Sequence, residues 1–397
     1  MTENIFIPDS RQDKFGFYTV DGLKFYSKFE ALQLAGQVNK PIKWNFNDAV
    51  YQSQDWSQEP TESLSEIYRQ RAQQLRDQYD YLVLWYSGGS DSSNILDSFV
   101  NNDIRLDEVA SCINYKATGN DTDIVNGEIF HVARPRVQQA QVLQPDLKYT
   151  VTDISQLSLD FFNDTKLDWI YHINTRWNPN LGAKFTEKIK LQNPVWADMI
   201  AQGKKVGFIW GTNKPLVNQI GNKFYFKFDD TLNISAEAQF QNHDGRFEEF
   251  FYWTPDMPKL VIKQAHVVRN HLMAVSTKSA GLVNTTVNPD FMAKNRFGTG
   301  CSVVVNQQVM HYDNELLNYV IYPSWTGNPY QQKSVSSVFV EKDHWFFNQG
   351  DSEESKRIYR MGMEKLWQDI PEEYRKDRTK FTMGWKRSSS TPYLVGN

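Results

Sequence analysis

YLVLWYSGGSDSSNILDSFV, residues 81–100, is the stretch that decides the fold. The uninterrupted apolar run Tyr81–Tyr86 is typical of a strand that is buried on both faces in a parallel sheet. Residues 87–93 hold a Gly-Gly pair among small polar side chains, and Asn94–Val100 begins a helical pattern. A strand, a tight turn and a helix N-terminus in direct succession predict a loop that binds a ligand.

The loop has the composition of an anion cradle. Glycines let the backbone turn sharply and approach a ligand, and the N–H groups at a helix start favour phosphate oxygens. Asp91 alone would repel phosphate, but a carboxylate fits there if Mg²⁺ lies between it and the phosphates. A plain strand–helix turn is the alternative, and the complete string favours the phosphate site over it. The predicted nucleotide-binding residues of the loop are Ser87, Gly88, Gly89, Ser90, Ser92 and Ser93.

The sequence on either side of the loop predicts an α/β sheet. Further strand candidates are Val109–Tyr115, Leu147–Ile154 and Lys205–Trp210. The segments between them have room for helices, and strands that alternate with helices predict a doubly wound sheet over roughly residues 80–230. A helix over 61–80, with Thr61 or Ser63 as its cap, leads into the first strand.

Both ends of the chain differ from this central pattern. Asp21-Gly22 separates two aromatic runs of alternating pattern and predicts an N-terminal β-hairpin. Beyond about residue 240 the periodicity weakens, and we expect a mainly helical and irregular region. The sequence therefore suggests a hairpin and helix extension at 1–79, a nucleotide-binding domain at 80–235 and a C-terminal substrate or partner region at 236–397.

A second motif, FIWGTNKP at 208–215, ends the last strand candidate. Ligands of open α/β sheets bind at the carboxyl ends of the strands, so we expect this motif to face the same crevice as the first loop. Gly211 is then predicted to contact the nucleotide, and Lys214 to neutralise phosphate charge in the transition state. A solvated lysine in a turn is the alternative. Asp229 and Asp230 follow an expected hairpin turn, where a surface position is favoured over a second pair of metal ligands.

The SGGSDS string resembles the signature of the PP-loop, or N-type ATP pyrophosphatase, family. This family includes asparagine synthetase, NAD and GMP synthetases, tRNA-modifying thiolases and phosphoadenosine phosphosulfate reductase. The resemblance covers roughly residues 80–230 and is most specific at 87–92. It implies a Rossmann-like sheet that binds ATP with Mg²⁺, attack of a substrate oxygen on the α-phosphorus, and release of pyrophosphate from an adenylated product. It further implies catalytic roles for Asp91, as metal ligand, and Lys214, with adenine near Asn114, Tyr115 and Lys116.

Several branches of that family are disfavoured by what the sequence lacks. The last cysteine is Cys301, without the surrounding motif of sulfonucleotide reductases, and the start Met1-Thr2 lacks the nucleophilic cysteine of glutamine-hydrolysing synthetases. Paired cysteines, a zinc-binding set, GxxxxGK[ST] and GxGxxG do not occur. Adenylation of an acceptor oxygen, followed by ligation or amidation, is the remaining enzymatic prediction. A protein that binds or sequesters nucleotide without turnover is the alternative, and a structural protein is least favoured.

Longer stretches, including the hairpin, Trp44–Asp48 and Phe251–Asp256, look similar to uncharacterised PP-loop proteins of large tailed bacteriophages. The formal net charge is -4, so no general affinity for nucleic acid is implied. A basic stretch at 375–387 with interleaved aromatics leaves contact with RNA or DNA open, although a solvated face is favoured. No secretory signal or membrane span is visible, which predicts a cytoplasmic protein, in the host cytoplasm if a phage encodes it.

Three arginines have neighbours that suit an anionic substrate: Arg134 and Arg136 in a loop around Pro135, and Arg176 among polar and aromatic residues. Solvated arginines are equally consistent with these positions. The seven histidines show no metal-ligand spacing, and His266 and His271 are expected to be ordinary core or surface residues of a helix after Pro258.

Overall fold

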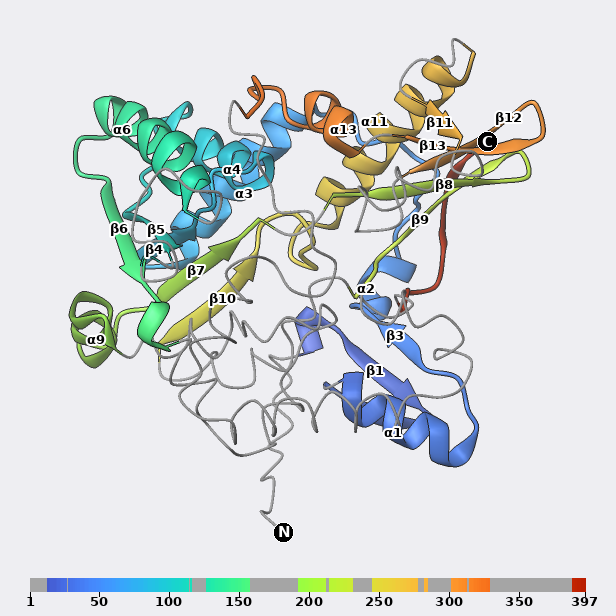
Figure 1. Cartoon of the computed structure of the whole chain (residues 1–397), viewed down its shortest axis with the longest axis horizontal. Coiled ribbons are helices and arrows are strands. Elements are labelled where there is room, and N and C mark those ends of the chain that lie inside the picture. The colour runs from blue at the N-terminus through green and yellow to red at the C-terminus, as the bar shows by residue number, and fades with distance from the viewer. Residues whose placement is uncertain are drawn as a thin grey trace.

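The computed structural model describes residues 13–26, 28–113, 115, 126–157, 192–211, 214–230, 245–277, 282–284, 301–312, 314–328 and 388–397. Over these ranges the chain is a mixed α/β protein with a five-stranded parallel sheet, a three-stranded antiparallel sheet and a six-stranded mixed sheet (Figure 1). The parallel sheet confirms the α/β class expected from the strand–turn–helix pattern.

The parallel sheet has the strand order β10-β7-β4-β5-β6. Its strands are β4 (Tyr81–Trp85), β5 (Glu108–Ile113), β6 (Lys148–Asp153), β7 (Val206–Trp210) and β10 (Arg246–Phe250). The first four confirm the strand candidates, and β10 comes from beyond the 80–230 stretch. The chain therefore builds outward from β4 in one direction through β5 and β6, and then in the other direction through β7 and β10.

Strand β4 is buried over its whole length, as its apolar run predicts. Leu82 and Leu84 belong to a large core that includes residues of helices α3, α4 and α6. Val83 and Trp85 belong to a second core with Trp196 of helix α9. The central strand thus separates two hydrophobic layers, one on each face of the sheet.

Among the described residues, four helices accompany the parallel sheet: α3 (Leu64–Gln78), α4 (Ser90–Val100), α6 (Arg134–Leu143) and α9 (Pro194–Ala201). Figure 1 shows α3, α4 and α6 grouped beside β4–β6, with α9 apart from them. Helix α3 begins at a capping box in which Ser63 and Glu66 bond to each other's backbone N–H, so Ser63 is the cap of the two candidates. A π-helical segment at Ile129–Ala133 precedes α6 directly.

The N-terminal sheet confirms the predicted hairpin. Strands β1 (Phe17–Val20) and β2 (Leu23–Phe25) pair antiparallel around Asp21-Gly22, and β3 (Lys43–Asn45) pairs with the other edge of β1. The short elements 3₁₀-helix Asp13–Phe15, α1 (Lys28–Val38) and α2 (Asp48–Gln52) complete this region.

The mixed sheet corrects the expectation for the C-terminal region. Its order is β11-β13-β12-β8-β9-β14, from β8 (Leu216–Ile220), β9 (Lys223–Lys227), β11 (Leu282–Asn284), β12 (Ser302–Val305), β13 (Gln308–Tyr312) and β14 (Tyr393–Gly396). Helices α11 (Pro258–Ser276) and α13 (Asn314–Ile321) are present as expected, but a mainly helical and irregular region is wrong for the part described. The β12–β13 turn uses Asn306 and Gln307 with positive φ, so no glycine signalled it.

Asp229 and Asp230 follow the β8–β9 hairpin and are buried, so their placement on a surface turn is wrong. Asp230 accepts hydrogen bonds from the Tyr18 hydroxyl at 2.9 Å and from the Ser388 backbone N–H at 3.1 Å. Asp229 forms a β-bridge with Ser389. These contacts join the N-terminal sheet to the last described segment of the chain.

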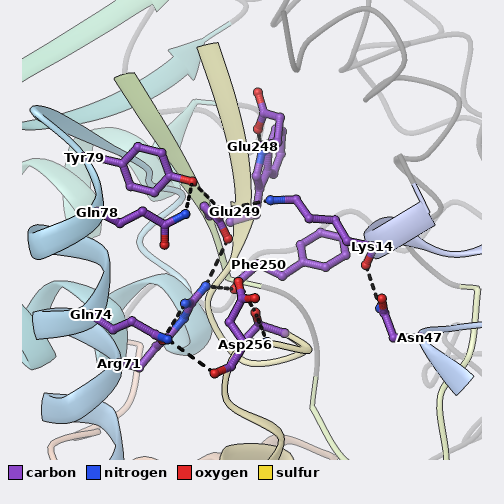
Figure 2. Close-up of polar contacts among 12 residues, drawn as sticks. Lys14, Asn47, Arg71, Gln74, Gln78, Tyr79, Glu248, Glu249, Phe250 and Asp256 are labelled. Carbon is purple, nitrogen blue, oxygen red and sulfur yellow. Dashed lines mark hydrogen bonds and ion pairs between the residues drawn. The ribbon is translucent and has the colours of Figure 1, made fainter. Parts of the chain in front are cut away.

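A buried charge network secures the edge strand β10. Figure 2 shows Glu249 at the junction of Tyr79, Lys14 and Arg71. Its carboxylate pairs with Lys14 Nζ at 2.9 Å and Arg71 Nη2 at 3.1 Å, and the Tyr79 hydroxyl also donates to it. Burial raises the pKa of Glu249, but the two cations outweigh it and hold the pKa below its usual value. The network fixes β10 to α3 and to the N-terminal segment.

Candidate functional site

The candidate site lies at the carboxyl ends of three neighbouring strands, β4, β7 and β10. The direction in which the sheet is built reverses between β4 and β7, and such a switch point leaves room for a ligand outside the strand ends. The SGGSDS loop follows β4, the Gly211–Lys214 loop follows β7, and Phe251-Tyr-Trp253 follows β10. Three stretches of sequence that are far apart in the chain therefore supply this edge of the sheet.

Gly88 sets the course of the first loop. Its φ is +81°, and a Cβ at this position would lie 3.1 Å from the Ala133 nitrogen in the segment before α6. A side chain here would meet both backbone strain and a close neighbour, so glycine is required on two counts. Gly89 occupies the N-cap position of α4, where no side chain caps the first turn.

The serines of the loop bond largely within the loop itself. Ser92 donates to the Gly89 carbonyl at 3.2 Å, and Gly89 N–H donates to the Ser87 hydroxyl at 3.3 Å. The Ser93 hydroxyl lies 3.1 Å from that of Tyr86 and 3.4 Å from the Gly88 carbonyl, and Ser90 is buried. These bonds hold the turn in shape, so the groups of this loop that could bind an anion are chiefly the backbone N–H groups at the uncapped helix start.

The second motif meets the first, as expected for a shared crevice. A Cβ on Gly211 would lie 3.2 Å from the Cβ of Asp91 and 3.2 Å from the nitrogen of Ser92, so the β7 loop touches the first turn of α4. Lys214 Nζ donates to Asp91 Oδ2 at 2.9 Å. The side chains of Asp91 and Lys214 are 29% and 21% exposed, so the pair can be reached from solvent.

Two tyrosines also contact Asp91, and the sequence analysis missed both. The Tyr322 hydroxyl, one residue beyond α13, donates to Asp91 Oδ1. The Tyr252 hydroxyl donates to the Asp91 carbonyl at 2.7 Å and accepts from Asn94 Nδ2 at 3.0 Å. Burial raises the pKa of each tyrosine well above its usual value, and the nearby Asp91 raises it further. Both hydroxyls therefore stay protonated and donate.

The segment that follows Tyr322 crosses helices α4 and α6. The Ser324 hydroxyl donates to Asp97 of α4, whose pKa is raised by burial. Arg136 donates to the Thr326 hydroxyl at 3.2 Å and stacks over the Trp325 ring at 4.9 Å from its centroid. We call residues 322–328 the strap, because they bridge the site helix to its neighbour.

Arg134 and Arg136 lie in the first turn of α6, so the loop expected around Pro135 is wrong. Arg134 stacks over the Phe130 ring at 4.5 Å, and Arg136 is engaged by the strap. Tyr115 is exposed, and its N–H donates to Asp153 at 3.2 Å. Four predicted features lie outside the described residues, namely Asn114, Lys116, Arg176 and the basic stretch 375–387.

The described residues include no group of three or more His, Cys, Asp or Glu side chains arranged to hold a metal. Mg²⁺ in nucleotide sites commonly takes only one or two carboxylates, with waters and substrate phosphates as the other ligands. A single, partly exposed carboxylate beside a glycine turn and a helix start without a side-chain cap fits that kind of site. Asp91 is thus the residue that would hold the metal.

No protein-family model matches the chain, and no curated protein matches it. In the part of the chain that the structure covers, none of the helices combines the length and apolarity that crossing a bilayer requires.

Proposed function

We propose that the chain binds ATP with Mg²⁺ at the carboxyl ends of β4 and β7 and uses it to adenylate an acceptor oxygen. The ion pair between Asp91 and Lys214 carries this proposal, because it brings the two motifs together at one strand edge. The negative charge of Asp91 suits the metal of a metal–nucleotide complex. The positive charge of Lys214 and the uncapped helix start suit its phosphates.

The strand order supports a Rossmann-like, doubly wound sheet of the PP-loop kind. If the five strands are numbered in chain order, their order across the sheet is 3-2-1-4-5 when read from β6 to β10. The Rossmann order is 3-2-1-4-5-6, so the two orders differ only in a sixth strand. Helices on both faces, with α4 on one and α9 on the other, agree with double winding.

Each charged part of the ligand would be bound by a group of opposite charge in the site. The backbone N–H groups in the first turn of α4 would hold the phosphates, with the metal on the Asp91 carboxylate and Gly211 against the nucleotide. When bound, Mg²⁺ would neutralise phosphate charge and orient the α-phosphorus for attack. Lys214, drawn to the departing pyrophosphate, would stabilise the charge that develops there.

The acceptor is a carboxylate, amide or carbonyl oxygen of a small molecule or macromolecule, and capture of the adenylate by an amine or ammonia would give ligation or amidation. A covalent thiol step is disfavoured at Cys301, because burial raises the pKa of its thiol to about 12. The activity would belong in the cytoplasm, where ATP and Mg²⁺ are available. If a phage encodes the chain, that is the host cytoplasm.

A nucleotide-binding protein without turnover is the second candidate. The internal bonding of Ser92 and Ser93 favours it to a degree, since these hydroxyls already serve the loop. Such a protein would keep the glycine turn and Asp91 but would release no pyrophosphate.

Calorimetric titration with ATP, AMP and a non-hydrolysable ATP analogue, with and without Mg²⁺, tests the proposal. We expect ATP binding that Mg²⁺ strengthens and that Asp91→Asn weakens. Pyrophosphate release in a screen of acceptors would then identify the enzyme, and binding without release under any acceptor would favour the second candidate. Absence of binding by any of the nucleotides would refute both.

A further inference from the structure

The two oxygens of the Asp91 carboxylate are held by different kinds of donor. Tyr322 donates to Oδ1 through a hydroxyl, and Lys214 donates to Oδ2 at 2.9 Å through an ammonium group. A carboxylate has about four lone-pair positions, so each oxygen keeps one for a further partner. The two donors differ in how firmly the fold holds them.

Tyr322 is fixed by its surroundings. Its side chain is 1% exposed, and its ring lies 5.6 Å from that of Tyr252. The carbonyl of the preceding residue, Ile321, accepts a bond from the Tyr68 hydroxyl at 2.7 Å, and Gln264 in turn donates to Tyr68 at 2.9 Å. Helices α3 and α11 thereby hold the end of α13 from which Tyr322 reaches the carboxylate.

The strap anchors Tyr322 from its other side. Ser324 bonds to Asp97, two turns along the same helix that carries Asp91, and Arg136 bonds to Thr326. A movement of Tyr322 away from Asp91 would therefore break contacts on both sides of it. Lys214 has a flexible four-carbon stem and its side chain is 21% exposed, so its ammonium group is less enclosed than the Tyr322 hydroxyl.

We infer that Tyr322 is a positioning residue that keeps hold of Oδ1, while Oδ2 is the place where Lys214 is exchanged for the metal of the bound nucleotide. This inference rests on the proposed binding of ATP with Mg²⁺. The phosphates carry more negative charge than one carboxylate, so they attract the lysine away from Asp91 as they settle on the loop. Oδ2 of Asp91 would then be open to a metal ion that supplies positive charge in place of the lysine, and the Tyr322 hydroxyl would keep the carboxylate from rotating.

The test is calorimetric titration of ATP into wild-type chain, Tyr322→Phe and Lys214→Met, each with EDTA and with Mg²⁺. The measured quantity is the gain in affinity that Mg²⁺ gives. For Tyr322→Phe we expect affinity in EDTA to change less than twofold, and the gain from Mg²⁺ to fall by about tenfold, as one hydrogen bond to a charged group is lost. For Lys214→Met we expect weaker binding in EDTA and an undiminished or larger gain from Mg²⁺, because Oδ2 is already open.

Tyr18→Phe is the matched control, because Tyr18 donates to the buried carboxylate of Asp230 at 2.9 Å and the same hydroxyl is removed. It should lower stability comparably and leave the gain from Mg²⁺ unchanged. The inference is overturned if Tyr322→Phe keeps the full gain, if Tyr18→Phe loses as much, or if Lys214→Met abolishes the gain. The last comparison decides the matter even if Tyr322→Phe does not fold. Each of these three outcomes overturns the inference about Tyr322 and Lys214 but leaves the proposed function standing, because the wild-type chain still binds ATP. A wild-type chain that binds no ATP overturns both the inference and the proposed function.

Discussion

Lys214 Nζ lies 2.9 Å from Asp91 Oδ2, across a sequence separation of 123 residues. The contact joins the loop after β7 to the first turn of α4, at the strand edge where the sheet reverses its direction of building. Each side chain is partly exposed, so the pair contributes little to stability by itself. The pair is therefore available to the charged ligand proposed above without a large cost in stability.

Asp91→Asn tests the site most directly. The amide keeps an oxygen acceptor for Tyr322 but loses the charge that would hold a metal. We expect the thermal midpoint to change little and any pyrophosphate release to fall by about 100-fold or more. Undiminished release in this variant would contradict the role of Asp91.

Gly211→Ala tests the contact between the two motifs. The added Cβ would lie 3.2 Å from Asp91 Cβ and from the Ser92 nitrogen, so the β7 loop has to shift away from α4. We expect ATP affinity to fall by about tenfold, which corresponds to roughly 1.4 kcal/mol. Gly221→Ala is the control, because that glycine has a φ of +63° in a turn with open space around it. It should lower stability and leave affinity unchanged, and equal affinity loss in both variants would argue against a local effect.

Glu249→Gln tests the network behind β10. The substitution leaves Arg71 buried without its carboxylate, and breaking such a pair costs about 3–5 kcal/mol in the free energy of unfolding. Urea denaturation measures the loss. Glu59→Gln removes a more exposed partner of Lys263 at 2.7 Å and should cost less than about 1 kcal/mol. If the two variants lost a similar amount of free energy of unfolding, the buried network would contribute no more to stability than an exposed ion pair.

We expect His266 to make stability depend on pH. Its Nε2 lies 2.9 Å from the Trp56 carbonyl, and its buried Nδ1 has no hydrogen-bond partner among the residues that the structure describes. Burial lowers the pKa of this imidazole, so the unfolded chain takes up a proton near pH 6.5 while the folded chain takes it up only at lower pH. The free energy of unfolding should thus fall as the pH drops from about 7 through 6.5, until the folded pKa is reached.

Denaturant titrations of wild type and His266→Gln across this range measure the effect of pH. The variant keeps a donor for the Trp56 carbonyl and should show a shallower dependence on pH. Burial also lowers the pKa of His271, so some dependence should persist in the variant. An unchanged slope would show that His266 is not the group responsible.

The two cysteines should differ in reactivity. Cys301 Sγ is buried between the Val217 N–H and the Pro215 carbonyl, each at 3.4 Å, and burial raises its thiol pKa to about 12. Cys112, at the end of β5, is partly exposed. A disulfide reagent at pH 8 should modify Cys112 in the native chain and Cys301 only in denaturant. Mass spectrometry of the digested adduct distinguishes the sites, and modification of Cys301 in the folded chain would contradict its burial.

The sequence was most informative where local pattern and burial agree. The apolar run of β4 predicted a doubly buried strand, Asp21-Gly22 predicted a hairpin, and Ser63 was one of two predicted caps. These features depend on a few neighbouring residues. The approach of the motif at 208–215 to the first loop was also anticipated, because parallel strands bring their carboxyl ends to one edge whatever their separation in sequence.

Features that depend on distant partners were missed. Tyr322 and Tyr252 carry no local mark that distinguishes them from other aromatic residues, and their role follows only from the packing of α13 and β10 beside α4. The β12 and β13 strands were missed because their turn lacks glycine. Asp230 was assigned to the surface because acidic residues are usually exposed, whereas here Tyr18 and the Ser388 N–H compensate for its burial.

Between β7 and β10 the chain leaves the parallel sheet to form β8 and β9 of the mixed sheet, and it then returns to add the edge strand. A single cut in the gene therefore cannot separate one sheet intact from the other. Recombination that exchanged the region after β7 would replace β10 together with Glu249 and Tyr252, so Arg71 and Asp91 would depend on another gene for those partners. The two sheets should accordingly be inherited together, and hybrid genes joined between residues 210 and 246 should give chains that do not fold.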